Sequence, residues 1–134
     1  MAAKPETTYI GKVHKHLSRD VYHMKNNNQY TGGIPDVYYS GSRYDLWIEY
    51  KYLPKIPTRA IVDPKKLLSS LQLQWLNGRY DEGRNVAVII GCPAGGVLLR
   101  NKAWETEMSA VEYKALIVSN LLLTRWIEIE VGTR

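Results

Sequence analysis

The sequence feature that most restricts the possible folds is a continuous run of five apolar residues, Val86 to Ile90. A short apolar run between turn-forming residues is typical of a buried strand, so we predict a strand over residues 86–91. The Gly95-Gly96 pair then predicts a turn into a second strand at 97–100. Two earlier strands, at 34–39 and 44–53, are predicted to form a β-hairpin around Ser40-Gly41-Ser42.

The remaining pattern is mainly helical. Apolar residues recur at helical spacing in three segments, 6–17, 64–81 and 104–120. Asp63 and Gly83 are suited to begin and end the second of these helices. Residues 125–131 alternate polar and apolar side chains and are predicted to form a strand. The other predicted features are loops at 18–33, with at most a short strand at 21–24, and at 54–63.

This order of elements indicates a mixed α/β (α+β) fold in a single domain over residues 1–134. The apolar runs are far shorter than the roughly 20 residues that cross a bilayer. The N-terminal residues contain no apolar secretory signal, and the single cysteine, Cys92, excludes an internal disulfide. We therefore predict a cytoplasmic protein, in the host cytoplasm if the protein is viral. The net charge of +5, from 18 Lys and Arg against 13 Asp and Glu, favours a polyanionic partner.

The candidate catalytic pattern in the sequence consists of Asp36, Glu49 and Lys51. Side chains alternate along a strand, so Glu49 and Lys51 share one face of the strand 44–53 while Tyr50 points to the core. Such a hairpin, with Asp36 near the start of its first strand, can place this second carboxylate beside Glu49. Two adjacent carboxylates repel each other, and Mg²⁺, or Mn²⁺ in its place, removes that repulsion by binding hard oxygen ligands. The backbone carbonyl of Tyr50 can add a third ligand, and Lys51 can offset charge on a phosphoryl group.

A simpler interpretation stays open for the same three residues. In it, Glu49 and Lys51 form an exposed ion pair worth about 0–1 kcal/mol, and Asp36 is a turn residue after Pro35.

The pattern Pro35-Asp36 followed by Glu49-Tyr50-Lys51 resembles the motif of the PD-(D/E)XK nuclease superfamily. The segment from Gly33 to Asp36, and a helix carrying Gln72 and Trp75, make it similar to small stand-alone virus-type replication-repair nucleases (VRR-NUC). The resemblance covers residues 6–90. It implies a restriction-endonuclease-like domain with a mixed central sheet flanked by helices. It also implies a magnesium-dependent endodeoxyribonuclease, a hydrolase that leaves 5′-phosphate and 3′-hydroxyl ends, and fits phage replication or DNA recombination.

Two further site residues follow from pattern and resemblance together. Gln72 lies on the apolar stripe of its helix, and the resemblance implies that it reaches the active site. The alternative is a core amide that is hydrogen-bonded elsewhere. Glu6 lies one helical turn before Ile10, and similar nucleases supply an acidic metal ligand from an N-terminal helix. The alternative for Glu6 is a glutamate stabilised by the positive end of the helix dipole.

Four basic residues close to this motif are candidates for contacting DNA phosphates: Lys55, Arg59, Lys65 and Lys66. Similar small nucleases are often homodimers, and two sites related by a two-fold axis suit a nearly symmetric four-way DNA junction. We therefore predict a structure-specific nuclease that resolves Holliday junctions. The apolar stripe between Met108 and Leu122 belongs either to the dimer interface or to the core.

Two other functions remain possible at this stage. A non-catalytic basic module would bind nucleic acid in a salt-sensitive way without Asp36, Glu49 or metal. A restriction-type enzyme would cut linear duplex DNA at discrete sequences.

Overall fold

A computed structural model describes residues 4–26 and 32–133, so part of the predicted loop 18–33 lies outside the described residues. Its centre is a five-stranded sheet in the order β1-β2-β3-β4-β5, which follows the sequence. Every neighbouring pair is antiparallel except β3 and β4, which are parallel. The strands are β1 (Tyr22–Lys25), β2 (Val37–Ser40), β3 (Asp45–Tyr52), β4 (Val86–Cys92) and β5 (Gly95–Leu99).

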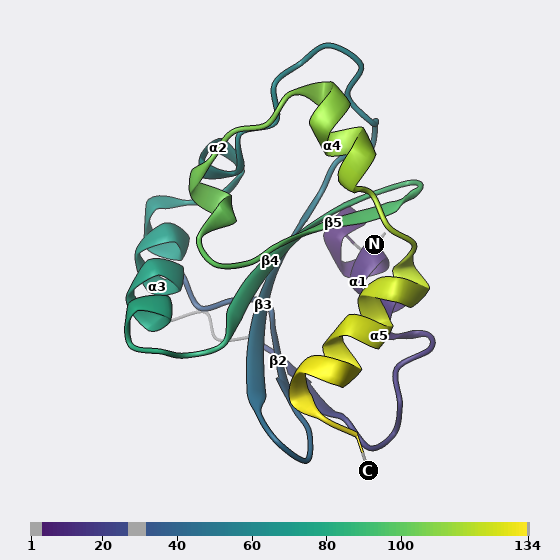
Figure 1. Cartoon of the computed structure of the whole chain (residues 1–134), viewed down its shortest axis with the longest axis vertical. Coiled ribbons are helices and arrows are strands. Elements are labelled where there is room, and N and C mark those ends of the chain that lie inside the picture. Colours follow the sequence, from purple (N-terminus) through teal and green to yellow (C-terminus); the bar gives the residue numbers. More distant parts are fainter. Residues whose placement is uncertain (1–3, 27–31, 134) are drawn as a thin grey trace.

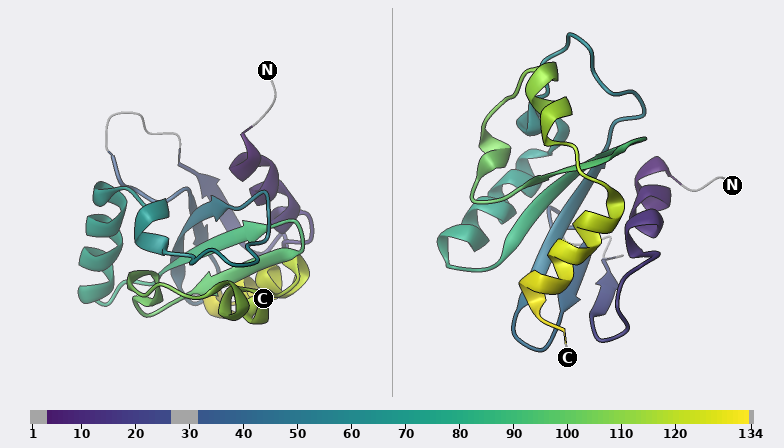
Figure 2. Two further views of the ribbon diagram at one scale, coloured as in Figure 1. Left: turned by 90° about the horizontal axis from the view of Figure 1, so that it is seen from above. Right: turned by 45° about the vertical axis from the view of Figure 1, so that its right-hand side comes forward.

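Helices cover both faces of this sheet (Figures 1 and 2). On one face, α1 and α5 contribute Ile10 and Ile127 to a core that includes Ile48. On the other face, α3 and α4 contribute Leu76 and Tyr113 to a second core, with β4 and β5. The helical elements are α1 (Pro5–His14), α2 (Pro64–Leu67), α3 (Ser70–Asp81), the 3-10 helix η1 (Ala103–Glu105), α4 (Ala110–Leu116) and α5 (Asn120–Val131).

The mixed fold class and the central hairpin are confirmed. Strand β4 is buried along its whole length, as its continuous apolar sequence predicts. None of the helices among the described residues has the length and apolar character needed to cross a membrane.

The single helix predicted over 64–81 is wrong in one respect, because the structure divides it into α2 and α3. Asp63 caps α2 as predicted, its side chain accepting a hydrogen bond from the Lys65 backbone amide. Leu68 is then extended, and Ser69 begins a new helix. The Ser69 hydroxyl accepts from the backbone amide of Gln72, while the Gln72 side chain accepts from that of Ser69. This reciprocal capping box starts α3 and stops the first helix from continuing.

The C-terminal predictions need a larger correction. Residues 104–120 are not one helix, because a second capping box, between Ser109 and Glu112, begins α4 only at Ala110. Residues 125–131 are helical rather than a strand, and they belong to α5, which Ser119 caps. Burial in α5 falls at helical spacing, and Ile129 within the alternating segment is 74% exposed. The buried residues of α5 are Leu123, Thr124, Ile127, Glu128 and Val131.

Candidate active site

The β2–β3 hairpin brings the two predicted carboxylates together. Val37 pairs with Ile48, so the antiparallel register places Asp36, one residue before β2, opposite Glu49. The backbone amide of Tyr50 donates a 2.9 Å hydrogen bond to Oδ2 of Asp36, which fixes that carboxylate against β3. The pairing that the sequence predicts is therefore built from two adjacent strands.

The glycine-rich segment before Asp36 packs closely against α3. Gly33 has a φ of +87°, and a Cβ at this position would lie 2.5 Å from the backbone oxygen of Leu71. A side chain would therefore meet both an unfavourable backbone conformation and a steric clash. Gly33 lets the chain pass beside α3 just before it reaches Asp36.

Glu49 lies at the centre of the site and is only 1% exposed. Its Oε2 accepts a 3.0 Å hydrogen bond from Nε2 of Gln72 and lies 3.4 Å from Nζ of Lys51. Its Oε1 is buried and has no hydrogen-bond partner among the described residues. Burial, followed by the negative charge of Asp36, raises the pKa of Glu49 to about 8, and Lys51 opposes this shift.

Gln72 is oriented by its own helix as well as by Glu49. The Oε1 atom accepts from the Ser69 backbone amide in the capping box, so Nε2 is directed toward the carboxylate. The structure thus places Gln72 at the site, as its resemblance to nuclease motifs implies. Gln74, two residues later, is exposed to solvent.

Tyr50 faces away from the carboxylates and joins a buried polar chain on the opposite face of the sheet. Its Oη lies 2.6 Å from Oη of Tyr39, which lies 2.7 Å from Nε2 of His14. Burial lowers the pKa of His14 to about 4, and the positive charges of His23 and Lys25 add to the shift. The half-buried His14 is therefore a neutral imidazole at pH 7.

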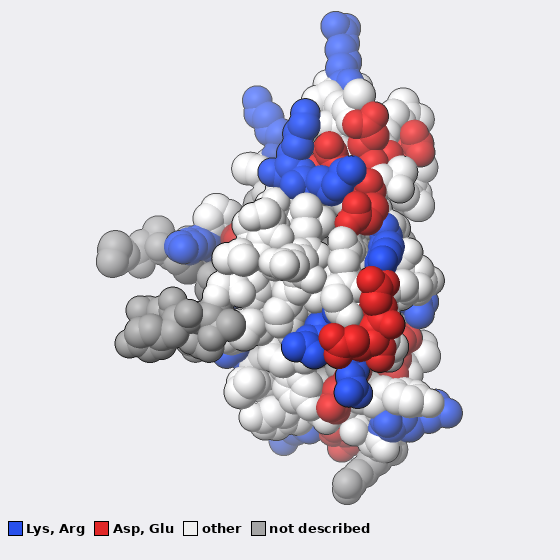
Figure 3. Space-filling model, turned by 90° about the vertical axis from the view of Figure 1, so that its left-hand side faces the viewer, with Lys and Arg blue, Asp and Glu red and all other residues white. Residues whose placement is uncertain are grey.

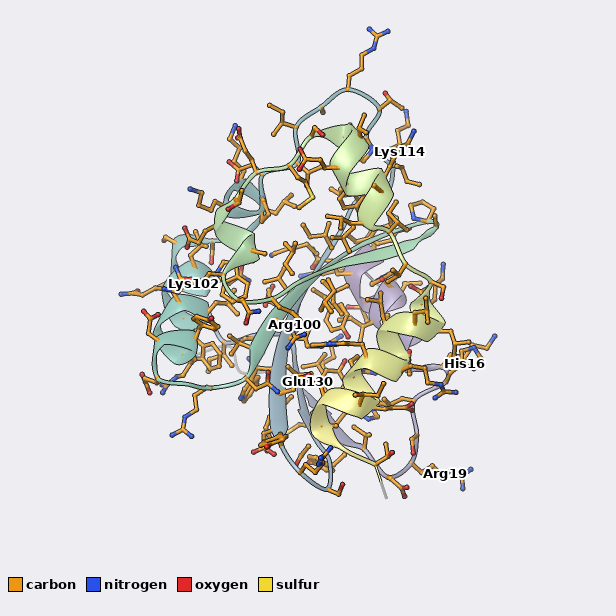
Figure 4. All side chains as sticks on the ribbon, viewed as in Figure 1. His16, Arg19, Arg100, Lys102, Lys114 and Glu130 are labelled. Atoms are coloured by element: carbon orange, nitrogen blue, oxygen red, sulfur yellow. The ribbon has the colours of Figure 1, made fainter. Side chains whose placement is uncertain are left out.

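We expect the His14 imidazole to make stability fall in acid. Its pKa is lower in the folded protein than in the unfolded chain, where it is 6.5, so the unfolded chain binds more protons. The contribution is complete above pH 6.5 and is lost as pH falls toward 4. In thermal or denaturant unfolding, the free energy of unfolding of wild type relative to His14→Gln should drop by about 2 kcal/mol over this range. His16→Gln, at an exposed position (Figure 4), serves as the control. Parallel pH profiles for wild type and His14→Gln would contradict the prediction.

The structure does not bring Glu6 together with the carboxylate pair. Glu6 lies in the first turn of α1, a helix that packs on the face opposite Glu49. Across residues 4–26 and 32–133, no group of three or more His, Cys, Asp and Glu side chains is placed to hold a metal ion. The predicted role of Glu6 as a ligand gains no support from this geometry.

The four predicted DNA-contacting residues are all exposed. Lys55 and Arg59 lie in the loop after β3, and Lys65 and Lys66 lie in α2, near the upper end of the molecule in Figure 1. Figure 3 shows Lys and Arg side chains gathered at the upper end of the side that carries α3, above a broad uncharged area. These positions are open to a large anionic partner.

The residues at the carboxylate pair fit a divalent cation. Asp36 and Glu49 supply hard oxygen atoms, and the unpartnered Oε1 of Glu49 is a buried acceptor that a cation would satisfy. A cation would also offset the repulsion that raises the pKa of Glu49. The predicted Tyr50 carbonyl belongs to the same stretch of β3. The chemistry of this donor set suits Mg²⁺ or Mn²⁺ better than a thiol-seeking metal.

Comparison with known proteins identifies the class of fold. No protein-family model matches the sequence, and no curated protein sequence matches it. Among the solved structures, one match shares this fold across nearly the whole chain. The match is to Hjc, a Holliday junction resolvase from the archaeal hyperthermophile Archaeoglobus fulgidus, with a TM-score of 0.57. It covers 91% of this chain and 97% of the resolvase chain at 13% sequence identity, a level at which the likeness establishes the fold.

Proposed function

We propose that this protein is a Mg²⁺-dependent endonuclease that cuts branched DNA, with Asp36, Glu49, Lys51 and Gln72 as its active-site residues. The observation that carries this proposal is the pair of opposed carboxylates, one with a buried and unpartnered oxygen, beside a lysine on the same strand face. The fold shared with an archaeal Holliday junction resolvase supports the same class of reaction.

The reaction is the hydrolysis of a phosphodiester bond. A water oxygen attacks phosphorus and releases a proton, the bond to the 3′ oxygen breaks, and that oxygen takes up a proton, so the products carry a 5′-phosphate and a 3′-hydroxyl. Asp36, Glu49 and the Tyr50 carbonyl would hold a divalent cation, which would supply positive charge beside the phosphoryl oxygens. Lys51 orients the attacking water and neutralises charge on the phosphate.

Gln72 acts as a positioning residue, because it holds Glu49 rather than substrate. Gln72→Ala removes both this hydrogen bond and half of the capping box, so we expect cleavage to slow about 10-fold and the apparent affinity for Mg²⁺ to fall. Gln74→Ala, on the same helix but exposed, is the matched control. A purely structural role would lower the thermal stability of Gln72→Ala without shifting the Mg²⁺ concentration that gives half-maximal rate.

The choice of branched DNA rests on fold and symmetry. We propose a homodimer whose two active sites cut a four-way junction symmetrically. Helix α5 carries exposed apolar residues at helical spacing, Leu122 at 57% and Ile129 at 74% exposure, with the half-buried Trp126 between them. Of the stripe predicted between Met108 and Leu122, Leu122 lies on this exposed face of α5, whereas Val111 is exposed separately, on α4.

Replacing Ile129 with glutamate tests the dimer. A charge in the centre of an apolar interface is costly to bury, so Ile129→Glu should shift the protein to monomer in sedimentation or light scattering. Paired incisions of a junction should become single nicks. Val111→Glu, at an equally exposed apolar position in α4, is the control. A wild-type protein that is monomeric at micromolar concentration would contradict the dimer and leave the nuclease proposal standing.

The substrate panel tests the function itself. Labelled four-way junction, flap, single-stranded and linear duplex DNA are incubated with the protein in Mg²⁺ or in EDTA. We expect metal-dependent cleavage with a preference for the junction. Cleavage of linear duplex at discrete sequences would instead identify a restriction-type enzyme. Binding without any cleavage in Mg²⁺ or Mn²⁺ would favour the non-catalytic basic module.

A further inference from the structure

Strand β3 and helix α3 face each other from the carboxylate pair to a pair of tryptophans, Trp47 and Trp75. On the α3 side of the sheet, β3 presents Glu49 and then Trp47, two residues earlier. Helix α3 presents Gln72, Trp75 and Arg79 at intervals of three and four residues, which places them on one helix face. Successive residues of the two stripes contact each other, Gln72 with Glu49 and Trp75 with Trp47.

Two contacts join β3 and α3, and a third lies within α3. Gln72 donates to Glu49, the rings of Trp75 and Trp47 meet edge to face at 5.5 Å between centroids, and the guanidinium of Arg79 lies over Trp75 at 5.5 Å. The α3 stripe spans about 10 Å at 1.5 Å per residue. Two residues of β3 span about 7 Å. The aromatic pair therefore lies within a few nucleotides of the proposed scissile phosphate, because phosphates follow one another at about 3.4 Å along each strand of a duplex.

The aromatic pair lines one side of a cavity of about 580 Å³. Its lining combines aromatic rings with arginines: Trp47, Trp75, Tyr44, Arg43, Arg79 and Arg84. The size is that of a pocket for a small organic group, and the lining suits a flat ring attached to an anion.

The balance of charge in the cavity is positive. Asp45 also lines it, but the Ser40 hydroxyl donates to this carboxylate at 2.7 Å. Arg79 is paired with the exposed Glu82. Among the described residues, Arg43 and Arg84 form no ion pair within 4.0 Å. These two guanidinium groups are available for a phosphate.

We propose that this cavity holds one unstacked nucleotide of the DNA substrate, within a few nucleotides of the bond that is cut, with its base on Trp75 and its phosphate on Arg43 and Arg84. This inference rests on the proposed nuclease function and adds the feature of DNA that the site recognises. A base inside a duplex has both faces covered by its neighbours and cannot reach an aromatic side chain. A branch point supplies unstacked bases, and stacking on an aromatic residue accepts any base. The cavity therefore selects branched over continuous duplex DNA without reading sequence.

The test measures binding in EDTA, where no cleavage occurs, using fluorescence anisotropy of a labelled four-way junction. A single abasic sugar is placed in turn at each of the first few nucleotides on either side of the branch. We expect one position to weaken binding by about 5- to 100-fold, the range for loss of one stacked base. Trp75→Leu, which keeps an apolar side chain but cannot stack, should weaken binding of the intact junction equally. The abasic sugar should then have no further effect in that variant.

The chain offers a control at an exposed aromatic residue outside the cavity. Tyr22 lies in β1, is 60% exposed and does not line the cavity. Tyr22→Leu should leave the abasic profile unchanged. The double variant Arg43→Gln/Arg84→Gln should lower the salt dependence of binding by the equivalent of about two phosphate contacts. Both positions are exposed, so the substitutions carry little risk to folding.

The outcomes separate this proposal from the nuclease proposal. An abasic scan with no sensitive position, or folded Trp75→Leu that binds the junction as wild type does, would overturn the nucleotide pocket even if the protein cuts DNA. A sensitive position that depends on Trp75, in a protein that cuts no DNA, would support the pocket and overturn the nuclease. Failure to bind any DNA at low salt would overturn both.

Discussion

Asparagine in place of Asp36 is expected to lower the rate of DNA cleavage by about 10²–10³-fold and to leave the fold intact. The amide oxygen of asparagine can still accept the hydrogen bond from Tyr50, so the hairpin keeps its geometry. The substitution removes the negative charge with which Asp36 would bind a cation opposite Glu49. The rate is measured under single-turnover conditions with saturating Mg²⁺, and folding is checked by thermal unfolding.

Asp20→Asn is the matched control, because Asp20 is an exposed aspartate in the loop before β1. It should cleave DNA at the wild-type rate. Equal rates and equal Mg²⁺ dependence for Asp36→Asn and wild type would show that Asp36 has no part in catalysis, and the proposed site would have to be abandoned.

Glutamine in place of Glu49 is expected to stabilise the cation-free protein while removing its response to Mg²⁺. The pKa of Glu49 rises from 4.5 to about 8 on folding, so the folded protein binds more protons than the unfolded chain between these pH values. Stability of the wild type therefore falls as pH rises from 4.5 through 8. Glutamine carries no charge and can still accept a hydrogen bond from Gln72. At pH 8 in EDTA, we expect Glu49→Gln to gain on the order of 2–4 kcal/mol in free energy of unfolding.

Added Mg²⁺ should stabilise the wild type more than it stabilises Glu49→Gln, the opposite of their order of stability in EDTA. A cation that binds the folded state raises the unfolding temperature of the wild type, since binding adds to the free energy of unfolding. Glu49→Gln should show little such rise. Glu82→Gln, at an exposed carboxylate paired with Arg79, is the control and should match the wild type in both experiments. If Mg²⁺ stabilises Glu49→Gln as strongly as wild type, Glu49 is not a ligand.

Together these two substitutions test one proposal, that the site is unfavourable for folding until a cation binds. A buried carboxylate with one unpartnered oxygen, opposite a second carboxylate, costs stability in the free protein. Residues that reduce stability in this way are common at functional sites. The expected gain in stability from Glu49→Gln and the expected loss of activity from Asp36→Asn are two consequences of one arrangement.

Sequence pattern alone predicts the central hairpin and the placement of its two carboxylates on neighbouring strands. Asp36 and Glu49 are close in the chain, and a tight hairpin with strict alternation leaves few ways to arrange them. The apolar run at 86–90 similarly requires burial, and it forms the buried strand β4. The presence of Gln72 at the site was implied by resemblance, and the Ser69-to-Gln72 capping box was a sequence signal that could have located the break before α3.

The secondary structure of the C-terminal third could not be predicted from local pattern in the same way. Residues 125–131 alternate in polarity, but burial in α5 depends on the sheet face on which the helix packs. Glu128 is polar and yet buried, because its carboxylate accepts hydrogen bonds from the Ser18 backbone and from Arg125. A partner 110 positions away in the chain gives no local signal.

The sequence by itself determined which residues form the strands of the hairpin, which face carries the carboxylates and lysine, and that the chain is basic. These properties depend on local alternation and composition. Only the tertiary structure decided that Glu49 would be fully buried, that Gln72 would hold it, and that arginines from three separate segments would meet beside Trp47 and Trp75. The physical reason is that burial and the convergence of distant side chains depend on how helices pack on the sheet, which local sequence does not encode.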